Sequence, residues 1–489
     1  MRKILLNVLA VALLALLAGC GNNTYTVAPP PTGPSGGNNA GFSVASLSGT
    51  YTFATTGVNA VGNTYYMFDV VGVFTTDGAG NVTSGYRDLY TDSGTQVQKE
   101  AVTGTYSVNQ DGRGQVELKG TNGTATYRFV LQSTGAASFF QFSPTADDIG
   151  RLFAQSSVAA PTGNFVVRLD GEDTSLNPFG SIGFLNISGT TVSGLLDQND
   201  DGTLSTLLAT TGSITAPDST GRGTMALTTS AGTHNFVYWV SSTGHLQLAS
   251  TDANFWLHGY ADQQTGVSGS TAAFSGGQVY SLSGVNSKGN IAQVGRFTLD
   301  GAGNIASGIE DYNDGFVLTT AAAVSGNYTA AATGRWTATT TSGLAASIVG
   351  WQVSASQSVL LVSNGTSTIE ETGTLRAQTT GLTNSSIVGE FAQDINGYSL
   401  DAGGNVEAVA NYLADGNGNL TGTMDSQTPG YYNTDYAETG TYSMQTNGRN
   451  TATAAGVPLI AYSVDANTFY LISSDPSRQY QGKLVKQVP

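Results

Sequence analysis

The sequence predicts an all-β protein in which four tandem copies of one module follow an N-terminal leader, each copy an eight-stranded antiparallel up-and-down barrel. Two observations lead to this prediction. A glycine followed three residues later by an aspartate recurs at Gly85, Gly194, Gly308 and Gly422, at steps of about 110 residues. Segments rich in Val, Thr, Tyr and Phe alternate with Gly, Asn, Asp and Ser, and no sustained helical period follows residue 20.

In the first copy we expect strands at 49–57, 65–76, 81–90, 97–108, 114–120, 124–132, 136–143 and 148–156. Because every connection is short, successive strands pair as antiparallel neighbours, and eight of them close most simply into a barrel without edges. Such a barrel is either filled by side chains or holds one small ligand. The alternative is a β-propeller of about eight blades, since "GTY" begins at both Gly49 and Gly104, half a repeat apart.

Three further markers recur in each copy. After the glycine come Asp88, Asp197, Asp311 and Asp425; a "GR" turn places Arg113, Arg222, Arg335 and Arg449; and each copy closes on a glycine five residues before Gln155, Gln264, Gln378 or Gln487. These markers predict modules at 45–158, 159–266, 272–379 and 385–488.

The first twenty residues place Arg2 and Lys3 before an apolar run that ends in "LAGC". This is the order of a secretory signal peptide, too short to span a bilayer. "LAGC" resembles the lipobox of bacterial lipoproteins, which implies that Cys20, the only cysteine, carries a diacylglycerol and begins the mature chain. Because Gly21 follows it, the resemblance implies the outer membrane or the cell surface. Residues 21–44, uncharged and rich in Pro, Gly and Asn, predict a linker or stalk.

Two weaker resemblances concern the repeats. The order of "GTY" on the first expected strand and "TGTY" on the fourth resembles the avidin and lipocalin group of meander barrels, in pattern only and without any ligand residues. The tandem arrangement is similar to uncharacterised exported repeat proteins of soil bacteria. The formal charge is -16, which disfavours nucleic acid and anionic headgroups as partners.

The glycine-rich stretches "FTTDGAGNVTSG" (74–85) and "FTLDGAGNIASG" (297–308) predict hairpin turns with glycine at positive φ. A phosphate cradle would need a helix after the loop, and here a strand follows. We expect Asp77 to pair with Arg113 at the pole where modules join, with Arg222, Arg335 and Arg449 in equivalent structural positions. The opposite pole, with Asp88, Asp197, Asp201, Asp311 and Asp314, is expected to be open to solvent.

Two stretches of the second copy were considered as metal sites. "DQNDDGTLS" places Asp197, Asn199 and Asp201 at positions 1, 3 and 5 of a calcium loop, although Leu208 occupies position 12, where a glutamate is required. An Asx-rich hairpin explains the same residues. His234, His245 and His258 lie too far apart along the expected strands for one zinc ion, so we expect packed or solvated histidines.

The chain contains no "GxSxG", "SxxK" or Walker motif. The sequence therefore favours a lipid-anchored cell-envelope protein with a non-catalytic binding or structural role, without a cofactor unless calcium binds. A glycan, a small apolar ligand or another envelope protein are the partners considered, and Tyr431, Tyr432 and Tyr436 are candidates for stacking on sugars. The alternative is an enzyme that acts on extracellular polysaccharide, whose carboxylates would converge in one cleft.

Overall fold

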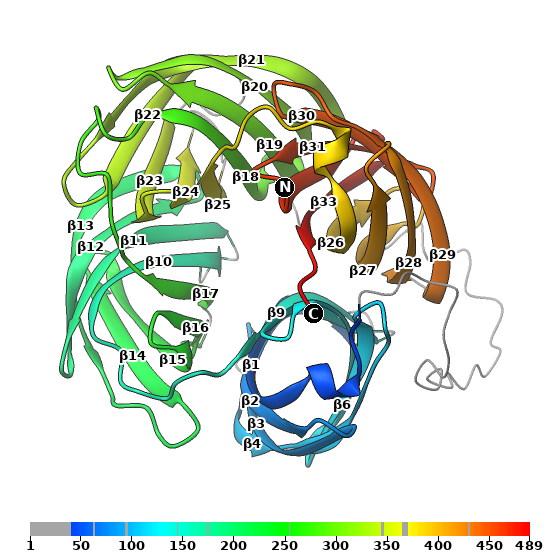
Figure 1. The fold of residues 1–489 in the computed structure, drawn as a ribbon. Coiled ribbons are helices and arrows are strands. Elements are labelled where there is room, and N and C mark those ends of the chain that lie inside the picture. Colours follow the sequence, from blue (N-terminus) through cyan, green and yellow to red (C-terminus); the bar gives the residue numbers. More distant parts are fainter. Residues whose placement is uncertain are drawn as a thin grey trace.

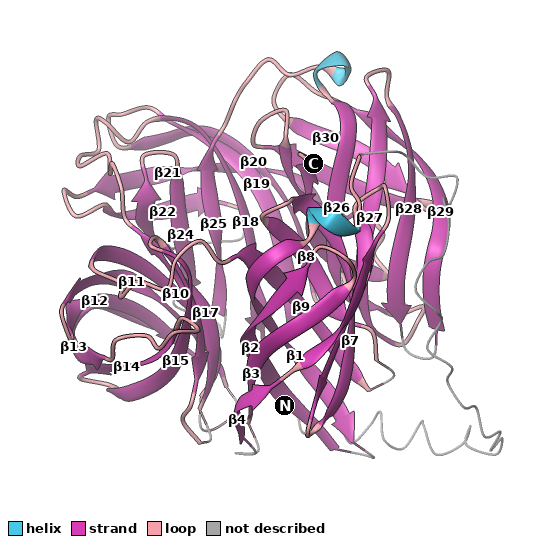
Figure 2. Cartoon of the chain, turned by 60° about the horizontal axis from the view of Figure 1, so that its bottom comes forward, coloured by secondary structure: helices cyan, strands magenta, loops and turns pink. Residues whose placement is uncertain are grey.

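The computed structural model describes residues 41–61, 64–92, 96–143, 145–173, 175, 177–253, 255–343, 347–363, 370–428 and 431–489. Strands make up most of these residues, and two short 3-10 helices, η1 (Val44–Ser46) and η2 (Asn384–Ser386), precede the first strands of the first and last repeats (Figure 2). The signal peptide, Cys20 and linker residues 21–40 lie outside the described residues. Within the described residues, no helix is long and apolar enough to cross a membrane.

Barrel 1 is a closed meander, because its second strand pairs with its third and its first strand pairs with its last. The fourth expected strand is present as two pieces, β4 and β5, which flank the buried Val102 and both pair with β3. Its strands are β1 (Ser48–Val61), β2 (Thr64–Asp77), β3 (Asn81–Thr91), β4 (Gln96–Ala101), β5 (Thr103–Val108), β6 (Arg113–Gly120), β7 (Gly123–Ser133), β8 (Ala136–Gln141) and β9 (Ala146–Ala154).

Barrels 2, 3 and 4 are closed eight-stranded meanders, so the predicted fold is confirmed and the propeller alternative is wrong. Barrel 2 comprises β10 (Gly163–Glu172), β11 (Pro178–Ser188), β12 (Thr191–Asp200), β13 (Thr203–Ile214), β14 (Arg222–Thr229), β15 (Gly232–Ser242), β16 (His245–Ser250) and β17 (Trp256–Gln263). Barrel 3 comprises β18 (Gly276–Asn286), β19 (Gly289–Leu299), β20 (Asn304–Asp314), β21 (Val317–Ala330), β22 (Arg335–Ser342), β23 (Ser347–Ser354), β24 (Gln357–Ser363) and β25 (Glu370–Ala377). Barrel 4 comprises β26 (Val388–Ser399), β27 (Gly404–Asp415), β28 (Asn419–Thr428), β29 (Tyr431–Ser443), β30 (Arg449–Ala454), β31 (Val457–Ser463), β32 (Thr468–Ser473) and β33 (Arg478–Lys486).

Apolar side chains fill the interior of each barrel. Barrel 1 is packed around Phe53, Tyr127 and Phe139, and barrel 3 around Trp336. These inward positions alternate with outward ones along every strand, as the pleat requires. Barrel 4 retains an apolar space of only about 50 Å³. That space is far below the 300–1,000 Å³ of typical ligand pockets, and binding of a small apolar ligand stays a prediction.

The four barrels stand in a ring, and the last barrel packs against the first (Figure 1). Each interface has its own apolar cluster, formed by outward-facing residues of two neighbouring barrels. Between barrels 1 and 2 the cluster includes Val71, Tyr90 and Trp239. Equivalent clusters join barrels 2 and 3 around Trp351, and barrels 3 and 4 around Tyr462. The smallest cluster, Val130, Phe140, Ala392 and Val409, closes the ring.

Candidate ligand-binding cavity

A buried Asp–Arg pair crosses each interface of the ring, and we call this pair the clasp. The aspartate lies on the third strand of one barrel, and the arginine begins the fifth strand of the next. Arg222 donates from Nε and Nη2 to the two carboxylate oxygens of Asp88, both at 2.9 Å. The same bidentate geometry joins Asp197 to Arg335 and Asp311 to Arg449. All three aspartates are fully buried.

Two more donors complete the surroundings of each clasp aspartate. The Tyr462 hydroxyl of barrel 4 donates to Asp311 Oδ2 at 2.6 Å, and the Ala321 backbone N–H of barrel 3 donates to Oδ1 at 2.9 Å. Ala321 has a φ of +52°, which is uncommon for a residue with a Cβ, and its bulge aims this N–H at the carboxylate. The Trp239 indole and the Lys99 backbone N–H donate to Asp88 in the same way. The Trp351 indole and the Leu207 backbone N–H donate to Asp197.

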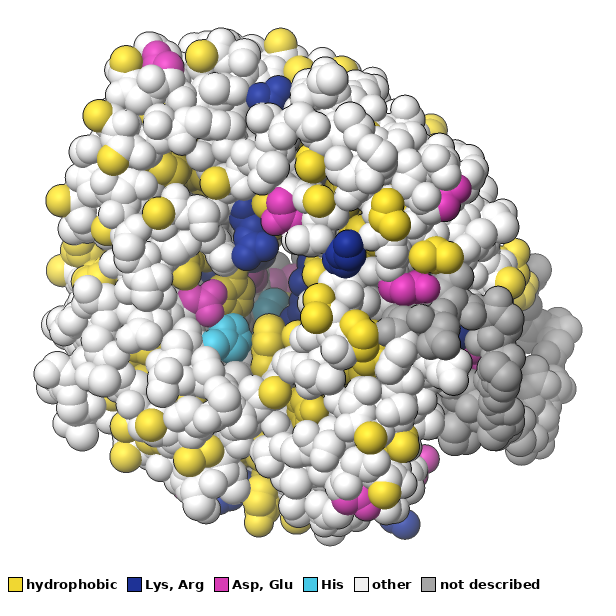
Figure 3. Space-filling model, viewed as in Figure 1, with side chains coloured by type: hydrophobic (Ala, Val, Ile, Leu, Met, Phe, Trp, Pro, Cys, Tyr) yellow, Lys and Arg dark blue, Asp and Glu magenta, His cyan; other side chains and the backbone are white. Residues whose placement is uncertain are grey.

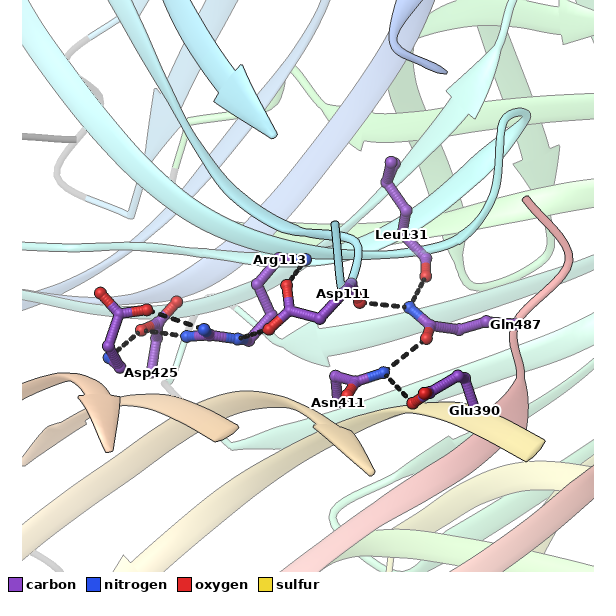
Figure 4. A network of polar contacts seen from close by, with 8 residues as sticks. Asp111, Arg113, Leu131, Glu390, Asn411, Asp425 and Gln487 are labelled. Atoms are coloured by element: carbon purple, nitrogen blue, oxygen red, sulfur yellow. Dashed lines mark hydrogen bonds and ion pairs between the residues drawn. The ribbon is translucent and has the colours of Figure 1, made fainter. Parts of the chain in front are cut away.

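The seam between barrels 4 and 1 has a clasp of its own, which carries two additional aspartates (Figure 4). Arg113 is fully buried and pairs with Asp425 at 2.9 Å, with Asp111 at 2.9 Å and with Asp435 at 2.7 Å. Val130 occupies the position of the aromatic donor, so Asp425 Oδ2 has no hydrogen-bond partner. Removing one partner of such a buried pair is strongly destabilising, which makes the clasps determinants of how neighbouring barrels align.

The closing glutamine of each repeat also reaches into the next barrel. Gln155 donates from Nε2 to the carbonyl oxygens of Thr220 and Val240, and Gln264 does the same to Thr333 and Gln352. Gln487 repeats the contact at the seam, where it donates to Asp111 and Leu131 of barrel 1 at 3.0 and 2.7 Å. The end of the chain thus occupies, on barrel 1, the place that a linker occupies at the other interfaces.

The structure corrects the sequence prediction for Asp77. Asp77 does not pair with Arg113; it is exposed and accepts hydrogen bonds from the Ala79 and Asn81 backbone N–H groups of its own turn, at 2.8 and 3.0 Å. A hydrogen bond from the Asn81 side-chain amide, together with these backbone bonds, holds the pKa of Asp77 below its ordinary value. Gly78 and Gly80 have φ of +73° and +103°, so "DGAGN" is the expected turn.

The prediction of a solvent-open pole was wrong for four of its five aspartates. Asp201 is exposed, but Asp314 is buried beside Asn286 and Lys288. Asp88, Asp197 and Asp311 are fully buried in the clasps, because their outward-facing sides meet a neighbouring barrel. Arg222, Arg335 and Arg449 pair with aspartates of the preceding barrel and not with turn residues of their own module.

Two of the three calcium candidates, Asp197 and Asn199, have partners across the interface between barrels 2 and 3. Asp197 serves the clasp through both oxygens, and the fully buried Asn199 donates to the Val362 carbonyl of barrel 3 at 2.7 Å. Asp201 is an exposed turn residue. Within the described ranges, no group of three or more His, Cys, Asp or Glu side chains could hold a metal ion. Calcium binding stays a prediction, but Asp197 has no free oxygen with which to begin such a site.

A cavity of about 680 Å³ lies where the four barrels face one another, and strands from all four line it. Figure 3 shows the hollow at the centre of the ring, with Lys and Arg, His and acidic side chains gathered in it. The first and eighth strands of each barrel provide most of its wall, and the seventh provides a smaller part. These strands face the axis because the clasps hold the neighbouring strands against the adjacent barrels.

Equivalent positions in the wall carry different residues. The middle layer comprises four cross-strand pairs, one from each barrel: Ala54 with Arg151, Arg168 with Tyr260, Ser281 with Thr374, and Asp394 with Lys483. Two residues further along the last strands, the cavity is lined by Phe153, Asp262, Arg376 and Val485. Two residues in the other direction it is lined by Ile149, His258 and Gln481, and by Asn396, the cross-strand partner of Gln481. The scaffold is fourfold, but the chemistry of its cavity is not.

Three carboxylates of the cavity have partners within it. Arg151 donates to Asp394, Arg168 lies 3.0 Å from Asp170, and His245 Nδ1 lies 2.7 Å from Asp262 Oδ1. Both cavity histidines sit among these groups, on neighbouring strands and four residues apart in register. His234 lies elsewhere, against Phe179 and Phe255.

Burial sets the charge of three further groups. It lowers the pKa of His258 to about 4, so that imidazole is neutral at pH 7. It raises the pKa of Asp69, which lies near His258, well above its ordinary value. It lowers the pKa of Lys483 to about 7, with Arg151 acting in the same direction and Asp394 against it. No sequence motif marked these residues, because each differs from its counterparts in the other copies.

No family model matches the chain, and no curated protein matches it. Among solved structures, the chain is similar to the crystal structure of the isotype 1 transferrin binding protein B from serogroup B Neisseria meningitidis, at 9% identity, with 73% of this chain and 82% of that chain covered and a TM-score of 0.19. A TM-score of this size carries no argument about fold, partner or function, so the function has to be inferred from the geometry of the cavity.

Proposed function

We propose that this protein is an exported, lipid-anchored binding protein of the cell envelope, and that the ring of barrels holds a small polar ligand in its central cavity. The observation that carries the proposal is the cavity, which has a volume of about 680 Å³ and draws its wall from all four barrels. This volume lies within the range of ligand pockets, whereas the barrel interiors are filled by their own side chains.

The unlike walls of the cavity support a single ligand in a single orientation. A fourfold structural ring would present four equivalent surfaces, but here Arg151, Tyr260, Thr374 and Lys483 stand at equivalent positions. A few well-placed polar groups of different character are what fixes the orientation of a small molecule in a pocket.

The test is a thermal-shift screen of small polar compounds on the full-length protein and on Ser281→Trp/Thr374→Trp, which fills one wall of the cavity. A ligand of the folded state raises the melting temperature. Compounds that stabilise the wild type should lose their effect in this variant and keep it in Ser84→Trp, an exposed position outside the cavity. Hits that stabilise both variants equally would place the site elsewhere.

The anchor rests on the lipobox and its single cysteine. Cys20→Ser should abolish incorporation of labelled palmitate, because the thiol that would carry the lipid is absent. Without acyl chains the protein has no stable membrane anchor, so it should leave the membrane fraction. Labelled protein in membranes from this variant would contradict the proposal.

A second candidate is an enzyme acting on extracellular polysaccharide, favoured by the convergence of Asp69, Asp170, Asp262 and Asp394 in one cavity. Burial raises the pKa of Asp69 well above its ordinary value, as a general acid requires, and Asp170 lies 3.0 Å from Arg168. Release of reducing ends from a polysaccharide panel, lost in Asp69→Asn, would establish this candidate. A panel without any hydrolysis would remove it.

A further inference from the structure

The cavity is richer in basic groups than the rest of this acidic protein. The chain has 18 Lys and Arg against 34 Asp and Glu, whereas four cations and four aspartates line the cavity, the cations being Arg151, Arg168, Arg376 and Lys483. Figure 3 shows Lys and Arg side chains at the central hollow, while few appear over the rest of that face. Basic groups gathered in a concave, partly desolvated site attract anions more strongly than the same groups would on an open surface.

Only two of these four cations have a carboxylate partner. Arg151 pairs with Asp394 and Arg168 with Asp170. In the described part of the chain, Arg376 and the Lys483 ammonium have no carboxylate within ion-pair distance, and the Arg376 guanidinium donates to the Gln357 side chain at 3.0 Å. Both lie on last strands of adjacent barrels, Arg376 on β25 and Lys483 on β33.

Arg376 and Lys483, the two cations without a carboxylate partner, lie in the same part of the cavity. The groups that face Lys483 are Asp394 on β26, Arg151 on β9, Arg376 on β25 and Tyr470 on β32. Three positive groups therefore share one negative group, which leaves an excess of positive charge on this wall. The remaining acid, Asp69, belongs to barrel 1 and lies beside His258, and burial raises its pKa well above the ordinary value.

From this arrangement we infer that the cavity binds a small anion, a carboxylate or phosphate group, held by Arg376 and Lys483 with Arg151 beside them. This inference rests on the proposed function and names the chemical class of its ligand. The guanidinium offers a planar fork of donors that matches two oxygens of such a group, and the ammonium adds a point charge. Tyr260, Thr374 and Thr468 in the same cavity offer further polar contacts and ring surface for the remainder of the molecule.

The charge state of Lys483 provides a second signature. Burial and the two arginines lower its pKa to about 7, so at pH 8 the free site is mostly neutral there. A bound anion favours the charged form and raises this pKa. Binding at pH 8 should then take up a proton, whereas a neutral ligand would leave the protonation of the site unchanged.

Isothermal titration calorimetry on the full-length protein in detergent tests the inference with three probes: inorganic phosphate, glucuronate and glucose, the last two differing in the carboxylate alone. We expect at least one anion to bind and glucose to bind at least tenfold more weakly. Arg376→Gln and Lys483→Met should each weaken the anion at least tenfold. Lys119→Gln, an exposed cation on barrel 1, should leave the affinity unchanged. Titrations at pH 8 in two buffers of different ionisation enthalpy should report proton uptake by the wild type.

Glucose binding as tightly as glucuronate, with loss of both in the wall-filling variant, would overturn the anion inference and leave the proposed function standing. Anion binding that survives both substitutions, or that proceeds without proton uptake in the unmodified protein, would overturn it as well. If neither anion binds the wild type, the inference is wrong whatever the thermal-shift screen finds.

Discussion

Tyr462→Phe isolates one hydrogen bond of the ring. The Tyr462 hydroxyl donates to Asp311 Oδ2 at 2.6 Å, and both side chains are fully buried at the interface of barrels 3 and 4. The substitution removes the hydroxyl and keeps the ring that packs in the interface. Asp311 retains both bonds from Arg449 and the bond from Ala321.

A hydrogen bond to a charged group contributes about 1.5 to 3 kcal/mol. Because three donors remain, we expect the lower end, about 1.5 kcal/mol lost from the free energy of unfolding. The measurement is equilibrium urea denaturation of the full-length protein followed by circular dichroism. The matched control is Tyr431→Phe in the same barrel, where the side chain is 72% exposed and the change should stay within about 0.5 kcal/mol. Equal stability of the two variants would refute the role given to the clasp.

Three further predictions follow from buried polar groups. Gln487→Ala leaves two carbonyl groups of barrel 1 without their donor, so hydrogen exchange should speed up at 110–113, while Gln155→Ala should instead affect the barrel 1–2 interface. Burial raises the pKa of Glu371 to about 8, so between about pH 4.5 and 8 this group binds more protons in the folded state than in the unfolded state. Its contribution to stability therefore falls as pH rises, and Glu371→Gln should make the fall in stability with pH less steep. Calcium should not raise the melting temperature, whereas Asp197→Asn should lower it with or without calcium, because it breaks a clasp.

Each of these has a contradicting result. Unchanged exchange at the seam in Gln487→Ala would mean that the chain terminus is not docked on barrel 1. A Glu371→Gln protein with the same pH dependence as the wild type would show that this carboxyl is ionised in the folded state. A calcium-dependent rise in melting temperature that Asp197→Asn abolishes would restore the metal site.

The barrels could be predicted from the sequence because their determinants are local. Alternating apolar residues, short connections and glycine turns such as "DGAGN" fix strands and meander order within about a hundred residues. The recurring aspartate and arginine were also visible, as separate markers in all four copies. The sequence predicted Asp77 as the partner of Arg113 and solvent around Asp88, whereas the structure joins Asp88 to Arg222 and Arg113 to Asp425 across modules.

The cavity could not be predicted for a different reason. Its wall is the outer face of first and last strands, which in an isolated barrel would be ordinary solvent-facing positions. Arg376 and Lys483 belong to different barrels and become neighbours only when barrels 3 and 4 pack against each other. Because each copy carries a different residue there, the internal repeat gives no signal for the site.

The central claim is that the chain closes into a ring in which its end docks on barrel 1. Val488 forms an isolated parallel bridge with Ser133 of β7, and its backbone N–H donates to the Gln132 carbonyl at 2.9 Å. Paired strands lie about 4.7–4.9 Å apart, within the Cα separation that a disulfide bridges. In a Cys20→Ser background, the two introduced cysteines are the only thiols.

The most direct measurement is therefore mild oxidation of Ser133→Cys/Val488→Cys, followed by thiol counting and intact mass on the monomer. The ring predicts an intramolecular disulfide in most of the protein. Ser133→Cys/Thr379→Cys is the control, because Thr379 follows barrel 3 and docks on barrel 4 through the Val464 carbonyl, so its thiols should stay free. Two free thiols in the monomeric Ser133→Cys/Val488→Cys protein would contradict the closed ring and, with it, the central cavity.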